Sequence, residues 1–263
     1  LVMKKFSGDL VNLDQYPLSD SKFRTQCKEK LDENGVLVLN NFLTSTAIAS
    51  IKGEGIDNQH LAYFTEKNHN IYLLPSDPEF PSDHPRNREV VSSKGCITTD
   101  QIPKGSALRV LYGALEFRDF LCAVLDTKEL YEYIDPLSSI NLHYASNGQE
   151  LGWHFDNSSF AITLLIQPPE YGGEFEYVRD IRDADKGDMN YQLSQQVLDG
   201  KIPSERLLLG AGSLVLFRGR NSLHRVTPAK GSQARMLAVL AYNTELGVSL
   251  SESARMTFYG RLG

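Results

Sequence analysis

Residues 212–217 read Gly-Ser-Leu-Val-Leu-Phe, an apolar run that follows a glycine and has the composition of a buried β-strand. Short runs of the same kind, separated by Gly, Pro and Asn, lie on both sides of it. Such spacing is typical of a β-sandwich or a jelly roll. The expected strands are residues 139–145, 160–167, 173–178, 205–209, 213–217, 223–227 and 234–243.

The N-terminal part, residues 3–138, has a mixed α/β pattern. Asp20-Ser21 is an N-cap signal for a helix that runs to about Glu33, and a short β run follows at residues 36–39. Further along, we expect helices at residues 44–51 and 108–130 and long loops at residues 65–105. The fold class expected is therefore mostly β with flanking helices, in a single domain over residues 3–263 with its β core at residues 139–250.

A polar stretch interrupts the series of strands. Residues 179–188 alternate acidic and basic side chains and lead into a predicted helix at residues 189–198. Two interpretations are open for residues 179–200, a solvated insertion or a lid over a pocket.

Composition excludes several classes of protein. The net charge of −6 argues against a nucleic-acid-binding surface, which requires a positive field. No apolar run approaches the roughly 20 residues that span a bilayer, and the N-terminus lacks the pattern of a signal peptide. The three cysteines are scattered and show neither a CxxC pair nor an even disulfide framework, which indicates free thiols in a reducing compartment. A cytoplasmic protein is expected, and its oligomeric state is not predicted.

Three residues form a candidate metal site. His154 and Asp156 are two positions apart, so on an extended strand both side chains point to the same face. His224 follows the strand predicted at residues 213–217. Two imidazoles and one carboxylate on one face of a metal leave three positions open, which suits non-haem Fe(II). A structural zinc site would instead take four protein ligands, usually including Cys.

Arg235 adds a second feature to this site. It lies eleven residues after His224, on the next predicted strand. A guanidinium there can hold the far carboxylate of a dicarboxylate through two hydrogen bonds.

With these residues, the sequence resembles the Fe(II)/2-oxoglutarate-dependent oxygenases. The resemblance is closest to the small enzymes that halogenate or hydroxylate free amino acids such as lysine. It implies a double-stranded β-helix core, a cupin-like jelly roll, with the metal between facing sheets, and it implies Fe(II), 2-oxoglutarate and O2 as cofactor and co-substrates. The matching segments are Asn141-Leu-His-Tyr144, His154 to Asp156, Gly172 to Phe175, Gly212 to Phe217, His224 and Arg235.

Asp156 distinguishes two reactions within this family. The halogenases carry Gly or Ala in place of the metal-binding carboxylate, which leaves a position for chloride. The resemblance therefore implies hydroxylation for this chain, with desaturation left open. The expected substrate is a small molecule, a free amino acid such as lysine. The alternatives are a peptide, a protein or another metabolite as substrate, and a non-catalytic cupin-like binding module.

Other residues have a functional and a structural interpretation. Asn141 and Tyr144 are expected to hydrogen-bond the co-substrate, as superfamily members do from this strand, although a Tyr there is often only packed. Asn157 and Trp153 are candidates for substrate binding, although Asn157 could instead form a turn or support the metal ligands, and Trp153 could be a pocket wall. Arg86 and Arg88 are candidates for binding a substrate carboxylate, as the resemblance suggests for an Arg in this region, or are surface arginines.

Overall fold

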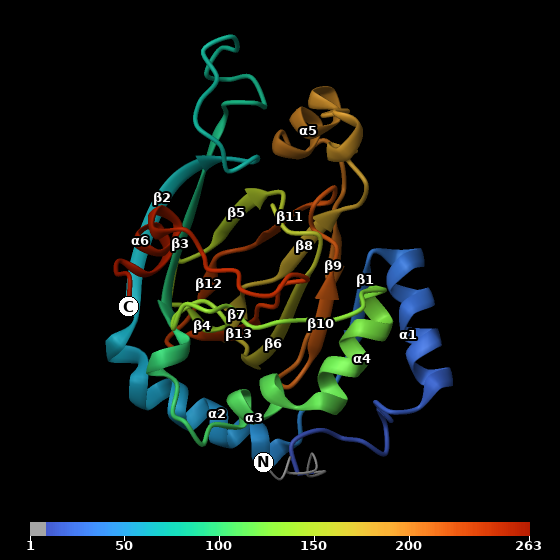
Figure 1. Ribbon diagram of the computed structural model, residues 1–263. Helices are drawn as coiled ribbons and strands as arrows, with labels where there is room; N and C mark the ends of the chain where they lie inside the picture. The colour runs from blue at the N-terminus through green and yellow to red at the C-terminus, as the bar shows by residue number, and fades with distance from the viewer. Residues whose placement is uncertain (1–8) are drawn as a thin grey trace.

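The computed structural model describes residues 9–263 and consists of two facing β-sheets flanked by helices (Figure 1). All strand pairings within the sheets are antiparallel. The large sheet has the order β1 (Val36–Leu39), β10 (Leu214–Phe217), β6 (Ala161–Gln167), β13 (Arg235–Leu240), β4 (Ile140–Ala145), β3 (Glu89–Ile97), β2 (Tyr63–Asn70). The small sheet has the order β5 (Leu151–His154), β11 (Leu223–Val226), β8 (Phe175–Val178), β9 (Glu205–Leu207), and a two-stranded sheet pairs β12 (Ala229–Lys230) with β7 (Tyr171–Gly172).

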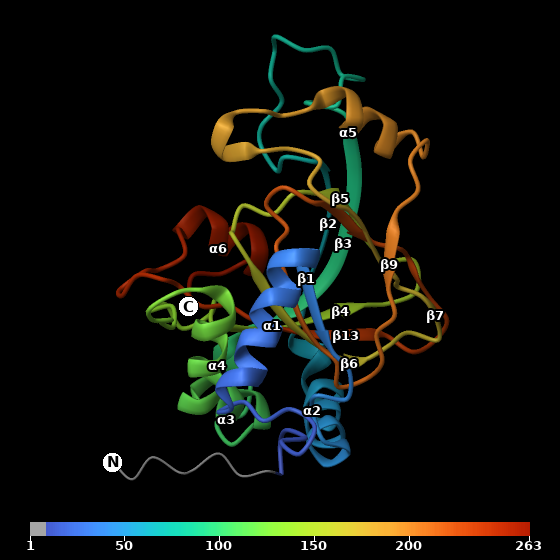
Figure 2. The ribbon, with the colours of Figure 1, turned by 90° about the vertical axis from the view of Figure 1, so that its right-hand side faces the viewer.

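Four helices cover the outer face of the large sheet (Figure 2). Side chains alternate along a strand, so one set faces these helices and the other faces the small sheet. Leu142, Leu164 and Ala238 belong to the first set and pack with Phe117 and Leu121 in the main core. The interior between the sheets is thereby left to the second set, which includes Arg235. The covering helices are α1 (Ser21–Asn34), α2 (Ser45–Asn58), α3 (Ala107–Gly113) and α4 (Leu115–Leu125).

Two smaller parts complete the molecule. A loop between β2 and β3 and the short helix α5 (Tyr191–Leu198) lie beyond the ends of the strands, opposite the main helices (Figures 1 and 2). The helix α6 (Glu252–Tyr259) packs on β2 and β3. No helix within residues 9–263 has the length and apolar character needed to cross a membrane.

The predicted fold class and the predicted strands of the C-terminal half are confirmed, with small differences at their ends. The predicted cap of the first helix is also confirmed, since the Asp20 carboxylate accepts a hydrogen bond from the Phe23 amide at 2.7 Å. Of the span 3–263 expected for the domain, residues 3–8 lie outside the described part of the chain. The strands β1, β2 and β3 come from its N-terminal part and join the same sheet as β4 and β13.

Two predicted elements were wrong. Residues 65–105 are not loops throughout, because β2 and β3 pair over eight residues from Tyr63↔Cys96 to Asn70↔Glu89. These strands were missed because β2 is an edge strand with mostly polar, exposed side chains and lacks an apolar alternation. The long helix predicted at 108–130 is divided at Ala114, which has an extended backbone, and ends at Asp126, whose backbone is left-handed.

Candidate metal centre

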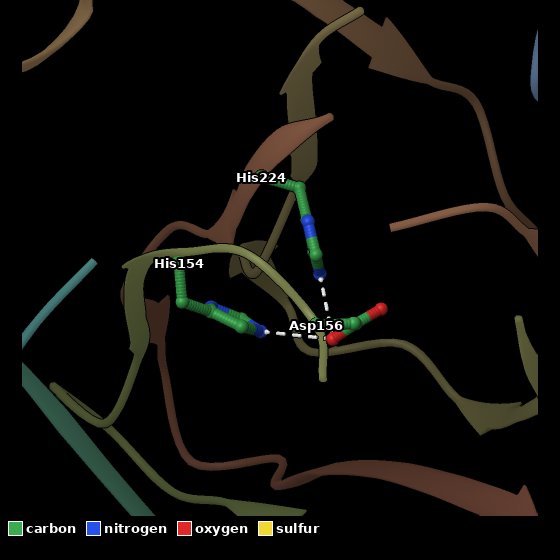
Figure 3. A group of neighbouring side chains, drawn as sticks. All are labelled: His154, Asp156 and His224. Carbon is green, nitrogen blue, oxygen red and sulfur yellow. Dashed lines mark ion pairs between the residues drawn. The ribbon is translucent and has the colours of Figure 1, made fainter. Parts of the chain in front are cut away.

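The pairing of two strands brings the two histidines together. His154 is the last residue of β5, and the register of β5 with β11 sets His224 directly opposite it. The centroids of the two imidazole rings are 4.2 Å apart. Figure 3 shows both rings pointing at the Asp156 carboxylate, which the chain presents two residues beyond His154.

The spacing of the three ligand atoms fits a single ion. The His154 Nε2 lies 3.6 Å and the His224 Nε2 lies 3.3 Å from the same oxygen, Asp156 Oδ1. Two metal–ligand bonds of about 2.1 Å at a right angle place their ligand atoms about 3 Å apart. Among the described residues, this is the group of His, Cys, Asp and Glu side chains whose ligand atoms converge in this way.

Backbone groups fix the orientation of both rings. The Nδ1 of His154 is 2.8 Å from the Gly152 carbonyl oxygen, and the Nδ1 of His224 is 2.9 Å from that of Ser222. A carbonyl accepts only, so Nδ1 carries the proton and donates it. The lone pair of each Nε2 is then available to a metal, which is the usual arrangement of ligating histidines.

Glycine is required beside the carboxylate. The Asp156 amide donates to the Gly219 carbonyl oxygen at 3.0 Å, which places the two residues side by side. A Cβ at Gly219 would lie 2.0 Å from Asp156 Oδ2 and 2.7 Å from a ring carbon of His224. Any side chain at Gly219 would therefore displace the ligands.

The electrostatics around Asp156 and His154 favour the protonation states that bind a metal. Burial raises the pKa of the Asp156 carboxyl, but hydrogen bonds with His154 and His224 and their charges outweigh this and hold it well below its usual range. Burial lowers the pKa of His154, and the proximity of His224 lowers it further. A carboxylate and a neutral imidazole are the forms that bind a metal ion.

Arg235, the predicted anchor, is a buried cation without an anion. Its side chain is 6% exposed, and no described residue forms a hydrogen bond or ion pair with its guanidinium. Burial lowers its pKa to about 10, so that it stays charged at neutral pH. It lines a cavity of about 390 Å³ with the Pro168–Phe175 turn. A buried charge requires a partner, and an anionic ligand would supply one here.

A second cavity, of about 550 Å³, reaches the metal centre from the side of β2 and β3. His154 and Asn157 line it together with His69, Ser92 and Lys94. The His69 ring lies edge-on to the His154 ring, with centroids 6.5 Å apart, and its Nε2 is 2.6 Å from Ser92 Oγ. This cavity is where a substrate would approach the metal.

Two of the predicted substrate residues lie next to the triad. Asn157 lines the larger cavity, and its backbone carbonyl accepts a hydrogen bond from Arg220 at 3.1 Å. Trp153 alternates with His154 along β5 and belongs to a separate apolar cluster, with the Arg225 guanidinium 4.7 Å from its ring centroid. It supports the strand from the face opposite the ligands.

The residues expected on β4 have other partners. Tyr144 is fully buried in the main core, and its hydroxyl donates to the Gly55 carbonyl oxygen of α2 at 2.5 Å. Its side chain thus points away from the metal. Asn141 faces the interior, but its amide donates to the Leu137 carbonyl and its Oδ1 accepts from the Tyr259 hydroxyl of α6. Neither side chain is placed beside the triad.

The two arginines expected to bind substrate also have other partners. Arg88 forms an ion pair with Asp199, at 2.6 Å, at the end of α5. Arg86 donates to the Pro75 carbonyl oxygen at 3.1 Å. Arg88 thus joins the β2–β3 loop to the segment at residues 179–200, whereas Arg86 is bonded within the loop itself. That segment also contacts the metal motif, because the Arg182 guanidinium lies 4.1 Å from the Phe155 ring centroid.

Sequence reasoning missed the polar residues that β2 and β3 contribute, above all Lys94. The signal that would have revealed them is an edge hairpin, and its polar side chains concealed it. His69 lines the larger cavity, and His143 contacts Lys94 on the inner face of the large sheet.

Comparisons with known proteins agree with this geometry. The sequence model of the family described as Halogenase D matches residues 19–257. No curated protein matches the chain. Many solved structures share its fold, among them the following three, whose identities of 10–14% indicate the fold alone.

The first is an oxidoreductase of the 2OG-Fe(II) oxygenase family from Burkholderia pseudomallei, with a TM-score of 0.52 and 14% identity over 86% of this chain and 93% of that one. The second is the non-haem α-ketoglutarate-dependent epimerase SnoN of nogalamycin biosynthesis, with a TM-score of 0.57 and 10% identity over 85% and 81%. The third is a Pseudomonas putida prolyl-4-hydroxylase, with a TM-score of 0.50 and 12% identity over 82% and 97%.

Proposed function

We propose that this chain, which belongs to the Halogenase D family of Fe(II)/2-oxoglutarate oxygenases, hydroxylates a small free amino acid such as lysine. Fe(II) is its expected metal, and 2-oxoglutarate and O2 are its co-substrates. The observation that carries the choice of reaction is the position of Asp156.

Asp156 favours hydroxylation over halogenation. A halogenating enzyme of this type needs an open metal position for the halide, where a carboxylate would otherwise bind. Here Asp156 Oδ1 lies within 3.6 Å of both Nε2 atoms, in the position of a third ligand. The carboxylate therefore leaves no such position. Desaturation of a C–H pair remains an alternative outcome of the same site.

Each residue of the centre has a defined task. His154, Asp156 and His224 would hold the metal, and the Gly152 and Ser222 carbonyls would keep the two rings in the right tautomer. The guanidinium of Arg235 would hold the far carboxylate of 2-oxoglutarate. When bound, the metal and co-substrate supply the activation of O2 and the oxidation of a C–H bond. The protein fixes the substrate in register with them.

The cavity beside His154 supports a small substrate. Its volume of about 550 Å³ falls in the range usual for small-molecule sites, roughly 300–1,000 Å³. Asparagines and two serines in its lining offer hydrogen bonds to a polar molecule, as a free amino acid requires. A peptide, a protein or a larger metabolite is the alternative, and would extend beyond this cavity.

The cysteines bear on the cellular location of the enzyme. Cys27, Cys96 and Cys122 are free thiols, which are usual in a reducing compartment. We therefore expect a cytoplasmic enzyme acting on a small molecule through one catalytic domain.

The function can be tested by product analysis. Iron-loaded protein would be incubated with 2-oxoglutarate, O2, chloride and each free amino acid in turn, and succinate and product masses followed. We expect one amino acid to gain a single oxygen atom, with equimolar succinate, and Asp156→Ala to lose this activity. Replacement of hydrogen by chlorine would contradict the role given to Asp156. Succinate without any modified amino acid would redirect the search to peptides and other metabolites, and no succinate at all would favour a binding module.

A further inference from the structure

A second cation lies near Arg235 on the inner face of the large sheet. The register pairs Arg235 with Ala145 and Gly95 with Tyr144, so Lys94 is level with Ala145 on its other side. The alternation of side chains puts Lys94, Ala145 and Arg235 on one face, away from the buried Tyr144. The small Ala145 side chain thus separates two basic residues across three neighbouring strands.

Lys94 has no anionic partner among the described residues. Its Nζ donates to the Nδ1 of His143 at 3.4 Å, and no carboxylate forms an ion pair with it. Burial lowers the pKa of His143 well below its usual range, and the charges of Lys94 and Arg235 lower it further. His143 is therefore a neutral acceptor that positions the ammonium without neutralising it.

The two cations open into different cavities. Lys94 lines the cavity of about 550 Å³ that also contains His154 and Asn157, and on its other side it lines a cavity of about 210 Å³ together with His143. Arg235 lines the other cavity, beside the Pro168–Phe175 turn. Once Arg235 is assigned to the far carboxylate of 2-oxoglutarate, Lys94 is left over on the side from which a substrate would approach. Lys67, another cation of this cavity, already donates to the Thr257 carbonyl at 3.0 Å.

We propose that Lys94 binds the carboxylate of the substrate. This inference rests on the proposed function and narrows it to substrates that carry a carboxylate within reach of the oxidised carbon. It also gives to Lys94 the task expected of Arg86 or Arg88, which are held by Pro75 and Asp199. The neutral His143 accepts one hydrogen bond from the ammonium, and two of the three N–H donors of Lys94 remain available to the carboxylate.

The test compares carboxylates with their amides. The protein loaded with Fe(II) and 2-oxoglutarate, kept without O2, would be titrated with each free amino acid and with its primary amide. Binding would be followed by calorimetry. We expect the wild type to prefer the acid by about tenfold or more, which is the usual contribution of a charged hydrogen bond. Lys94→Gln should lose this preference and Lys94→Arg should retain most of it.

Two controls make the result decisive. Lys67→Gln removes a charge from the same cavity and should leave the preference nearly unchanged. The affinity for 2-oxoglutarate should be the same in Lys94→Gln and the wild type, and a large loss would instead make Lys94 part of the co-substrate anchor. If no amino acid binds the wild type better than its amide, or if Lys94→Gln keeps the preference, the proposal is wrong.

The proposed function is judged separately from this binding test. It depends on succinate and product mass in the presence of O2, which the titration does not use. Hydroxylation of an amino acid without any dependence on Lys94 would leave the function standing and remove the inference. A preference for the acid that depends on Lys94, without hydroxylation, would do the reverse.

Discussion

The two sheets contribute opposite chemistry to the interior. The small sheet supplies His154 and His224, whose Nδ1 atoms are bonded to the backbone and whose Nε2 atoms converge on Asp156. The large sheet supplies Lys94 and Arg235, cations for which the described residues offer no anion. On the proposed roles, the small sheet with Asp156 would receive a metal cation, and the face of the large sheet with Lys94 and Arg235 would receive anions. These two surfaces are called the metal wall and the anion wall. The difference teaches that bound ligands complete the charge balance of this interior.

The largest expected effect is on the metal wall. Asp156→Ala removes one of three metal ligands, so turnover should fall by about 100-fold or more and the affinity for iron should fall with it. Succinate formation and the bound iron per chain measure both. Asn157→Ala, one residue further on, is the matched control and should retain iron. Full iron binding by the Asp156 variant would contradict the assignment of the ligand.

Replacing Arg235 tests whether its guanidinium binds 2-oxoglutarate. Arg235→Met should weaken 2-oxoglutarate binding by about 100-fold, because a bidentate charged contact is lost. The ligand-free variant should nevertheless unfold at higher temperature, because a buried cation without a partner is replaced by an apolar side chain, a gain of about 1–3 kcal/mol.

Thermal denaturation with and without 2-oxoglutarate separates these two effects. The wild type should be stabilised by the ligand much more than Arg235→Met. A ligand-free variant less stable than the wild type would mean that Arg235 has an internal partner.

A substitution at Gly219 tests how much space the Asp156 carboxylate has beside the metal site. In Gly219→Ala the new methyl group would meet Asp156 Oδ2, so the carboxylate must shift and the affinity for iron should drop by about tenfold. The fold should survive, as judged by far-ultraviolet circular dichroism. Gly210→Ala is the control, because a Cβ there meets nothing within 4 Å. Equal iron affinity in both variants would show that the carboxylate has room to move.

The smallest expected effect concerns Asp135, whose carboxylate accepts a hydrogen bond from the Leu250 amide just before α6. Burial raises the pKa of Asp135, but hydrogen bonds from the Leu250 amide, from Ser138 and from the Leu137 amide outweigh it, and the pKa is lowered. A lowered pKa stabilises the fold above the carboxyl's unfolded value, near 4, and the contribution disappears as the pH falls through the folded-state pKa.

Asp135→Asn should therefore cost about 1–2 kcal/mol of unfolding free energy at neutral pH, and this cost should shrink below about pH 4. Urea denaturation at pH 7 and pH 3.5 measures it. A cost that stays the same at both pH values would mean that the charge of Asp135 is not what stabilises the segment.

The sequence allowed the metal wall to be predicted because its signals are local. His154 and Asp156 are two residues apart on a strand, and His224 and Arg235 follow apolar runs whose period is clear. The fold class was predictable for the same reason. The anchor role of Arg235 remains a prediction, and its burial without an anion supports it.

The anion wall was less predictable because it depends on strand register. Tyr144 was expected at the co-substrate, but the alternation along β4 turns it toward Gly55 and leaves His143 on the inner face. Lys94 comes from a strand that carries no apolar pattern, so neither the strand nor its partner was apparent. Arg86 and Arg88 lie in a loop, where contacts such as that with Asp199 cannot be derived from spacing.

The position of Arg235 has a consequence for product release. The decarboxylation of 2-oxoglutarate changes the end of the molecule next to the metal and leaves the far carboxylate as it was. As the proposed anchor, Arg235 would therefore make the same contact with succinate as with the co-substrate, and only the metal end would distinguish the two. The enzyme is for this reason expected to be inhibited by its own by-product and by other short dicarboxylates, so its rate in a cell would follow the ratio of 2-oxoglutarate to succinate.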